Sequence, residues 1–297
     1  MPFARTVVHY HHASVLMLLN GFHMSDSNPQ PDYLLGVNQQ EFERLRFQHG
    51  VWGPVTRNFL NRLGVQKGWR CLDVGAGPGF VTFDLRELVG DEGEVTALEP
   101  SGLYLSWLTD QVAVKGWNNV KFVQGSAEEN SLPSRSYDLV FVRWVVAFVP
   151  NAEKFLSQLF STLKVGGIIA IQDYYYEALS LYPHGGPWDE MPAIVRAYYR
   201  SGGGDPYVTA KIPEIFTRHG LKLIDFTPTC LSGGPSSDVM EWAHRFFDIH
   251  VPLMAQKGII RPEQAAALQN DWRDHRKNPQ TLFFSPLVVD VAGVLRL

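Results

Sequence analysis

The chain has 297 residues, of which 45% are hydrophobic, so it can bury the core of one large domain or of one domain with a cap. Its 26 basic and 30 acidic residues give a net charge of −4, and this mild acidity argues against a dominant nucleic-acid-binding surface. Two cysteines, Cys71 and Cys230, build no disulfide framework, and no apolar run reaches transmembrane length. We therefore expect a cytoplasmic protein that has neither a nucleic acid nor a membrane as its partner.

The first 30 residues differ from the rest and are predicted to form a flexible N-terminal extension. His9, His11 and His12 cluster there, but no cysteine or acidic residue stands at ligand spacing, so the pattern predicts no metal site. The apolar run 15–19 is too short for a secretory signal. Met24 precedes a polar stretch, and we expect the functional chain to begin near it.

Residues 31–64 are predicted to form a helical flap before the main domain. Apolar side chains recur at helical spacing from Glu41 to Leu63. Gly53 and Pro54 interrupt this pattern, and because proline disfavours a helix interior we expect two helices rather than one.

From residue 65 to residue 297, strand and helix patterns alternate. The expected strands are 70–74, 94–98, 120–124, 139–143, 168–172, 221–227 and 281–294. The expected helices are 80–88, 102–114, 152–163 and 207–219, followed by helical segments at 236–256 and 262–274. This alternation predicts an α/β fold with a doubly wound, mainly parallel, seven-stranded sheet whose last strand is antiparallel. Right-handed crossovers then place the loops after the parallel strands at one edge of the sheet.

Residues 174–205 break the alternation. The segment is rich in tyrosine, glycine and proline, and it follows the predicted strand 168–172. An irregular aromatic stretch at the carboxyl end of a strand predicts an inserted lid or substrate wall. Packing of a helix at 193–200 accounts for part of these aromatic residues.

The most informative stretch is 70–80, R-C-L-D-V-G-A-G-P-G-F, where a predicted strand ends in three glycines. Gly75, Gly77 and Gly79 allow a sharp turn and a close approach of a ligand, and the next helix directs its free N–H groups at the same space. The dinucleotide pattern G-x-G-x-x-G fails because Phe80 stands in the third glycine position. A tight turn without a ligand is the alternative.

The sequence D-V-G-A-G-P-G resembles the first motif of class I S-adenosylmethionine-dependent methyltransferases, of the bacterial small-molecule type. Glu99 ends the second predicted strand, where this family has an acid, and 163–167 resembles the turn before the family's fifth strand. The resemblance covers about 39–226. It implies a Rossmann-like fold, a helical N-terminal flap, and S-adenosylmethionine as the cofactor.

The resemblance also implies contacts to the adenosine half of the cofactor. Glu99 is expected to accept hydrogen bonds from both ribose hydroxyls. Pro100 and Ala127 offer an apolar surface to the adenine, and Ala127 also offers its N–H group. Ser126 stands where the family usually has an acid for the adenine amine, so that contact is in doubt.

The methionine half of the cofactor is zwitterionic. The N–H groups of Gly75, Ala76 and Gly77 suit its carboxylate, and Asp73 either binds its ammonium group or caps the turn.

Three further residues complete the predicted cofactor site. Tyr33 and Gln48 belong to the flap and are expected to contact the methionine half; alternatively, Tyr33 packs and Gln48 is solvated. Arg143 ends the fourth predicted strand beside the expected methyl-transfer centre, where it either positions an anionic acceptor or anchors a loop.

The implied reaction is in-line transfer of a methyl group to an O, N or C atom of a small-molecule metabolite. The enzyme mainly aligns the reactants and excludes water, and it needs a base only if the acceptor arrives protonated. Asp173, Tyr174 and His184 are the candidates for that base. Residues 143–146 read R-W-V-V in place of the Asn/Asp-Pro-Pro-aromatic sequence typical of nucleic-acid amine methyltransferases.

Two other functions stay open. A non-catalytic cofactor-binding or interaction protein would keep the fold, and Ser126 favours it; an oxidoreductase on a similar sheet is disfavoured by Phe80. The sequence does not determine the oligomeric state, and a homodimer is compatible with it.

Overall fold

The computed structural model describes residues 38–128 and 132–296. The predicted extension 1–30, the expected start near Met24 and the candidate Tyr33 lie outside the described residues.

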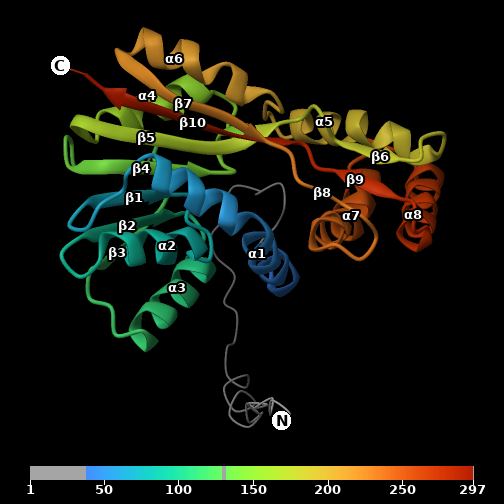
Figure 1. Cartoon of the computed structure of the whole chain (residues 1–297), viewed down its shortest axis with the longest axis horizontal. Coiled ribbons are helices and arrows are strands. Elements are labelled where there is room, and N and C mark those ends of the chain that lie inside the picture. Colours follow the sequence, from blue (N-terminus) through green and yellow to red (C-terminus); the bar gives the residue numbers. More distant parts are fainter. Residues whose placement is uncertain (1–37, 129–131, 297) are drawn as a thin grey trace, which may run out of the picture. The chain divides into compact units, whose positions relative to one another are not determined.

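A seven-stranded sheet is the centre of the described chain (Figure 1). Its strands are β1 (Arg70–Val74), β2 (Glu94–Glu99), β3 (Val120–Gln124), β4 (Tyr137–Arg143), β5 (Leu163–Tyr175), β7 (Leu221–Thr229) and β10 (Leu287–Leu295). Their order is β3-β2-β1-β4-β5-β10-β7, and β10 runs antiparallel to both neighbours. This confirms the predicted α/β, Rossmann-like sheet. The order reverses between β1 and β4, and ligands of such sheets bind at this switch point.

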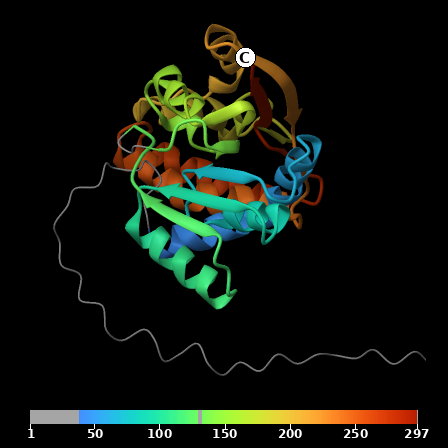
Figure 2. The ribbon, with the colours of Figure 1, turned by 90° about the vertical axis from the view of Figure 1, so that its left-hand side faces the viewer.

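Helices lie on both faces of the sheet (Figure 2). They are α1 (Gln39–Arg62), α2 (Phe80–Val89), α3 (Gly102–Val114), α4 (Ala152–Phe160), α5 (Met191–Ser201), α6 (Ile212–Arg218), α7 (Asp238–Gln256) and α8 (Pro262–Lys277), with short 3-10 turns η1 (Val146–Phe148), η2 (Pro187–Glu190) and η3 (Val208–Ala210). Alternate residues of β1 serve the two layers: Cys71 packs with Leu85 of α2, and Leu72 belongs to the cluster of Leu156 of α4. Cys71 is therefore a small core residue, as its place in a strand predicts.

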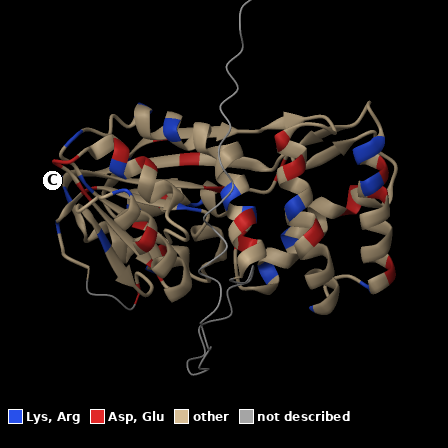
Figure 3. Cartoon of the chain, turned by 90° about the horizontal axis from the view of Figure 1, so that it is seen from below, with Lys and Arg blue, Asp and Glu red and all other residues tan. Residues whose placement is uncertain are grey.

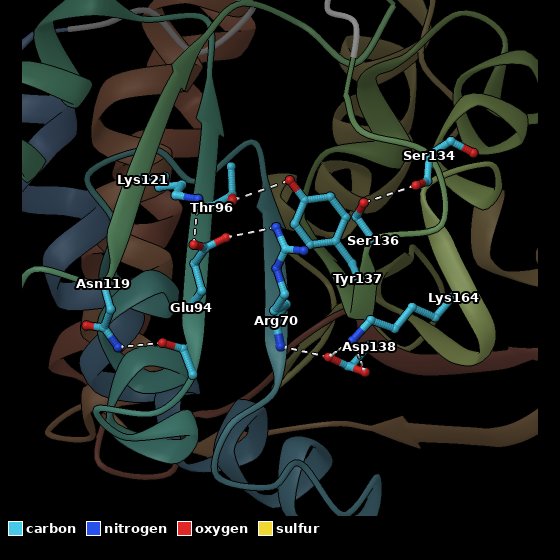
Figure 4. A network of polar contacts seen from close by, with 11 residues as sticks. Arg70, Glu94, Thr96, Asn119, Lys121, Ser134, Ser136, Tyr137, Asp138 and Lys164 are labelled. Atoms are coloured by element: carbon cyan, nitrogen blue, oxygen red, sulfur yellow. Dashed lines mark hydrogen bonds and ion pairs between the residues drawn. The ribbon is translucent and has the colours of Figure 1, made fainter.

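Polar contacts fix the strand register at the amino-terminal edge of the sheet, opposite the glycine turn (Figure 4). The N–H group of Arg70 donates to Asp138 at 2.8 Å, and Lys164 donates to the same carboxylate at 2.7 Å. The Arg70 guanidinium also donates to Glu94 at 3.1 Å. These contacts join the first residues of β1, β2, β4 and β5. They lie at the opposite edge of the sheet from the glycine turn.

The prediction of two helices before residue 64 is wrong, because α1 continues through Gly53 and Pro54. Proline removes one backbone donor and crowds the carbonyl four residues earlier, which here belongs to Gly50. Gly50 is exposed and has no side chain, so water can satisfy that carbonyl. Burial of Trp52 and Thr56 on either side of the proline holds the helix together.

A second, three-stranded sheet was not predicted. It consists of β6 (Ser180–Tyr182), β9 (Leu282–Phe284) and β8 (Ser232–Gly233). The expected single strand 281–294 is therefore divided between two sheets, and Pro286, which cannot donate to a ladder, stands at the break. Helices α5, α7 and α8 gather beside this small sheet (Figure 1). The segment 174–205 contains β6, η2 and α5, and its role as a lid stays a prediction.

Basic and acidic side chains are interspersed along the helices (Figure 3). None of the helices in the described ranges combines the length and the apolar character that a bilayer crossing requires.

Candidate functional site

The three glycines after β1 are needed for different reasons. All have positive φ: 67° at Gly75, 54° at Gly77 and 84° at Gly79. A Cβ at Gly75 would lie 2.4 Å from Val145, and one at Gly79 would lie 2.2 Å from Leu108, so these two positions are glycine because of packing. A Cβ at Gly77 would meet no atom within 4 Å, so the space beside Gly77 is open to a ligand.

Glu99 lies beside this open space and is buried at the end of β2. One carboxylate oxygen accepts a hydrogen bond from the N–H group of Gly77 at 2.8 Å, and the other accepts from Ser101 at 2.9 Å. Burial raises the pKa of Glu99, and the two backbone hydrogen bonds oppose that shift. Each oxygen keeps a further lone pair, so the side chain is fixed in place and can still accept from a pair of hydroxyls.

The backbone N–H groups of the turn are already used within the chain. Gly75 and Ala76 both donate to the carbonyl of Leu98, at 2.8 and 3.1 Å, and Gly79 donates to Ala76 at 2.9 Å. With Gly77 bonded to Glu99, the expectation that the N–H groups of 75–77 hold a carboxylate is not supported by this geometry. In this sharp turn the backbone N–H groups donate to other groups of the chain, which the sequence pattern did not show.

Asp73 stabilises the glycine turn by a contact with the start of α2. Its carboxylate is buried and accepts a hydrogen bond from Thr82 Oγ1 at 2.6 Å, in the first turn of α2. Burial raises the pKa of Asp73 to about 6, against the lowering effect of Thr82. Of the two predicted roles, this arrangement supports the capping role, because the N-cap residue Gly79 has no side chain to do it.

The predicted adenine residues lie after β2 and β3 at the same edge of the sheet. Ala127 is buried, Ser126 is half-buried and Pro100 is exposed. The carbonyl of Pro100 accepts from Gln124 at 3.4 Å, which ties the two loops together. The position at which the family usually has an acid is therefore a half-buried serine, next to the buried Ala127.

Arg143 and Trp144 end β4 directly beside the turn. Arg143 donates to Thr56 Oγ1 at 3.0 Å and contacts His49 Nδ1 at 3.3 Å, so it anchors α1 rather than a loop. Its guanidinium lies 4.7 Å from the Trp144 ring. Trp144 has a φ of 54°, an uncommon and unfavourable conformation for a large residue.

Asp173, one of the predicted bases, is committed to the backbone. It is fully buried and accepts from the N–H groups of Tyr174 at 2.8 Å and Ala147 at 3.1 Å. Burial raises the pKa of Asp173 to about 6, and its backbone hydrogen bonds oppose the shift. These contacts fix the loop after Trp144, which supports a bracing role rather than proton transfer.

His184 and Tyr174, the other two candidates, have different surroundings. His184 is exposed and lies 3.3 Å from Asp189. Tyr174 is buried and stacks on Trp144, with ring centroids 5.8 Å apart. Burial and the neighbouring Tyr176 raise the pKa of Tyr174 well above its ordinary value, so its hydroxyl stays protonated. Tyr174 is therefore the candidate that lies at the switch point, as a hydrogen-bond donor rather than a base.

A buried ion pair on α1 was not predicted. Arg44 donates to both carboxylate oxygens of Glu41 at 2.7 Å and to Gln48 Oε1 at 2.8 Å. Gln48 also accepts from Trp242 Nε1 of α7 at 3.0 Å. Gln48 is thus buried and not solvated, and it joins the flap helix to α7; its contact with a cofactor stays a prediction.

An aromatic cavity of about 20 Å³, roughly the space of one water molecule, continues from Tyr174. Its lining is apolar and aromatic: Tyr174, Tyr176, Leu179, Val195, Trp242, Ala243, Phe246, Phe247, Phe283 and Pro286. No charged group lines this cavity among the described residues.

Part of the chain is similar to known methyltransferases. Residues 65–197 match a family model described as a methyltransferase domain. The demethylmenaquinone methyltransferase of Geobacillus stearothermophilus is 34% identical over 112 residues, which are 38% of this chain and 48% of that protein. The chain spans about half the length of the curated relatives it matches.

Solved structures share the fold at low sequence identity. The YcgJ protein of Bacillus subtilis superposes with a TM-score of 0.55 at 18% identity, over 81% of this chain and 98% of that one. The [4+2]-cyclase SpnF superposes with a TM-score of 0.53 at 16% identity, over 82% and 81%. The fold therefore hosts more than one chemistry.

Proposed function

We propose that this chain, whose residues 65–197 form a class I S-adenosylmethionine-dependent methyltransferase domain, transfers a methyl group from S-adenosylmethionine to a small, flat, uncharged acceptor. One observation carries the proposal: the buried Glu99 carboxylate is held by Gly77 and Ser101 beside an open space at Gly77.

The residues at the switch point fit the donor. Glu99 has lone pairs left for the two ribose hydroxyls, and the glycine at 77 leaves room for the adenosine. Pro100 and Ala127 provide an apolar ledge for the base. No described side chain fills the space beside Gly77, so the donor needs no rearrangement of the turn itself.

The chain's own contribution to the reaction is alignment and exclusion of water. The bound donor supplies an activated methyl group on a sulfonium. Trp144 and Tyr174 form an aromatic wall at the carboxyl end of β4 and β5, and the Tyr174 hydroxyl can donate a hydrogen bond to an acceptor oxygen. Preorganised groups of this kind align the reactants and keep water out.

The acceptor class follows from the aromatic cavity. Its lining offers apolar surface and ring faces but no counter-charge, which favours an aromatic acceptor of low polarity. The matched relatives are named as demethylmenaquinone and ubiquinone/menaquinone methyltransferases, which supports a ring carbon or oxygen of a quinol as the first acceptor to test. The small volume requires that the walls open to admit any such molecule.

None of the three candidate bases, all of which lie in the described part of the chain, is a free base at the site. Asp173 is engaged by backbone N–H groups, His184 is exposed beside Asp189, and Tyr174 keeps its proton. We therefore expect the acceptor to bind uncharged and to lose its proton to water rather than to a described side chain, so that the more acidic phenols of a panel are methylated faster.

The experiment is methyl transfer from labelled S-adenosylmethionine to a panel of hydroquinones, phenols and amines, with product identified by mass spectrometry. Transfer to a hydroquinone or phenol is the expected result. Tight binding of the donor with no turnover on the panel would favour the second candidate, a cofactor-binding protein that keeps the fold, for which Ser126 in place of an acid is the specific observation.

A further inference from the structure

Arg143 contacts no anion in the part of the chain that the structure describes. Among residues 38–128 and 132–296, its hydrogen-bond partners are the neutral Thr56 and His49, and no carboxylate forms an ion pair with it. Charged side chains in an interior are normally paired, so an unpaired guanidinium at a candidate site requires a reason.

His49 cannot supply the missing charge, because it is neutral and acts only as an acceptor. Both terminal nitrogens of Arg143 contact His49 Nδ1 at 3.3 Å, so the ring proton resides on Nε2, which lies 3.5 Å from Asp84. Burial and the charges of Arg143 and Arg57 lower the pKa of His49 to about 3, which keeps the ring uncharged.

The contacts of Arg143 leave one edge of its guanidinium available. A guanidinium has five N–H donors; the terminal nitrogens direct two at His49 and a third at Thr56. The two that remain are the Nε–H group and one Nη2–H group, which lie side by side and match the two oxygens of a carboxylate. The Trp144 ring adds a cation–π contact, with its centroid 4.7 Å from the guanidinium carbon.

This edge belongs to the switch point. Val74 pairs with Val142 in the sheet, so Gly75 and Arg143 are the next residues on two adjacent strands. The donor's methionine half carries a carboxylate, and the backbone donors of the turn are already used by Leu98 and Glu99. Asp73 and Asp84 act on Arg143 from a distance and raise its pKa, but burial lowers it overall to about 10, so the side chain stays charged at neutral pH.

We propose that Arg143, oriented by His49, Thr56 and Trp144, binds the carboxylate of the methyl donor in place of the glycine-turn N–H groups. This inference rests on the proposed function and names the group that recognises the amino-acid end of the donor. His49 and Thr56 are positioning residues, since they act through Arg143.

The test compares S-adenosylmethionine with its decarboxylated form, which keeps the adenosine, the sulfonium and the amine. Isothermal titration calorimetry on the full chain measures both ligands against wild type, Arg143→Gln and Arg143→Lys. The matched control is Arg57→Gln. Arg57 is a cation of α1, the helix that Arg143 contacts, and it is paired with Asp84 at 3.2 Å.

We expect Arg143→Gln to weaken S-adenosylmethionine binding about 10- to 100-fold and to leave the decarboxylated ligand unchanged, because only the first has the charged group that Arg143 binds. Arg143→Lys, which keeps the charge without the planar fork, should lie between them. Arg57→Gln should not discriminate between the ligands.

Equal affinity losses for both ligands, or none, in a folded Arg143→Gln or Arg143→Lys variant would overturn the inference. If Arg143→Gln fails to fold, Arg143→Lys is judged by the same comparison of the two ligands, and if neither variant folds, His49→Ala is used instead. A loss of affinity confined to the carboxylated ligand supports the inference. Any other pattern overturns it. Wild-type protein that binds neither ligand would instead overturn the proposed function. Selective loss of a carboxylate-bearing acceptor, with donor affinity intact, would assign Arg143 to the acceptor and reject the donor assignment.

Discussion

Replacing Glu99 by alanine should weaken both donor binding and the fold around the glycine turn. The carboxylate accepts hydrogen bonds from Gly77 and Ser101 at 2.8 and 2.9 Å. Hydrogen bonds to charged groups contribute about 1.5–3 kcal/mol each, so we expect the loss of these two to lower the free energy of unfolding by about 3–6 kcal/mol. Loss of the ribose contacts should weaken binding of S-adenosylhomocysteine, the demethylated donor, by about 1–3 kcal/mol, or roughly 5- to 150-fold in Kd.

The assay is calorimetry with S-adenosylhomocysteine and its 2′-deoxy analogue. If Glu99 holds the 2′-hydroxyl, removing that hydroxyl lowers affinity for the wild type but not for Glu99→Ala. Glu94→Gln is the matched control at the other end of β2: its ion pairs with Lys121 and Arg70 are partly exposed, so donor affinity should not change. A Glu99→Ala variant that still distinguishes the two ligands as the wild type does would refute the ribose assignment.

Four further substitutions test the packing of the glycine turn, the space beside Gly77, the titration of His250 and the role of Tyr174. Gly79→Ala should lower the free energy of unfolding by about 2–4 kcal/mol, because its methyl group would lie 2.2 Å from Leu108 at a φ of 84°. Gly77→Ala should cost only about 1–2 kcal/mol in denaturant titrations but should weaken S-adenosylhomocysteine binding in calorimetry, and the reverse pattern would contradict the open space. Burial lowers the pKa of His250 to about 3, so its stabilising contribution is complete above pH 6.5 and is lost as the pH falls toward 3. The loss is about 2 kcal/mol at pH 5. Between pH 7 and pH 5 the free energy of unfolding of the wild type should therefore fall by about 2 kcal/mol more than that of His250→Gln. Equal falls in the two proteins would contradict the lowered pKa of His250. Tyr174→Phe should slow methyl transfer while leaving donor affinity unchanged, which a kinetic and a calorimetric measurement together check.

The sheet was predictable because its signals are local. Buried parallel strands appear as short apolar runs, and β1 and β3 have the bounds that their sequence patterns predict. The turn after β1 was recognisable because three glycines in five residues have few uses. Glu99 was predictable from its place at the end of β2, where it now lies buried beside Gly77.

What the sequence did not reveal depends on contacts between distant residues. The flap helix buries Glu41, Arg44 and Gln48, a polar stripe that resembles a solvated face until α7 covers it. His49 and Thr56 are seven residues apart on that helix, and only the register of β4 brings them to one guanidinium. No local pattern encodes such a long-range pairing.

The small sheet escaped prediction for a similar reason. Its strands have two or three residues each, and they come from three separate parts of the chain. Strands this short show no alternation that a sequence pattern could detect.

The most direct measurement is a crystal structure of the full chain with S-adenosylhomocysteine. We expect the adenosine beside Gly77, with both ribose hydroxyls on the Glu99 carboxylate. A ligand bound elsewhere, or a turn closed by the protein's own side chains with Glu99 directed away from it, would contradict the assignment of the donor site.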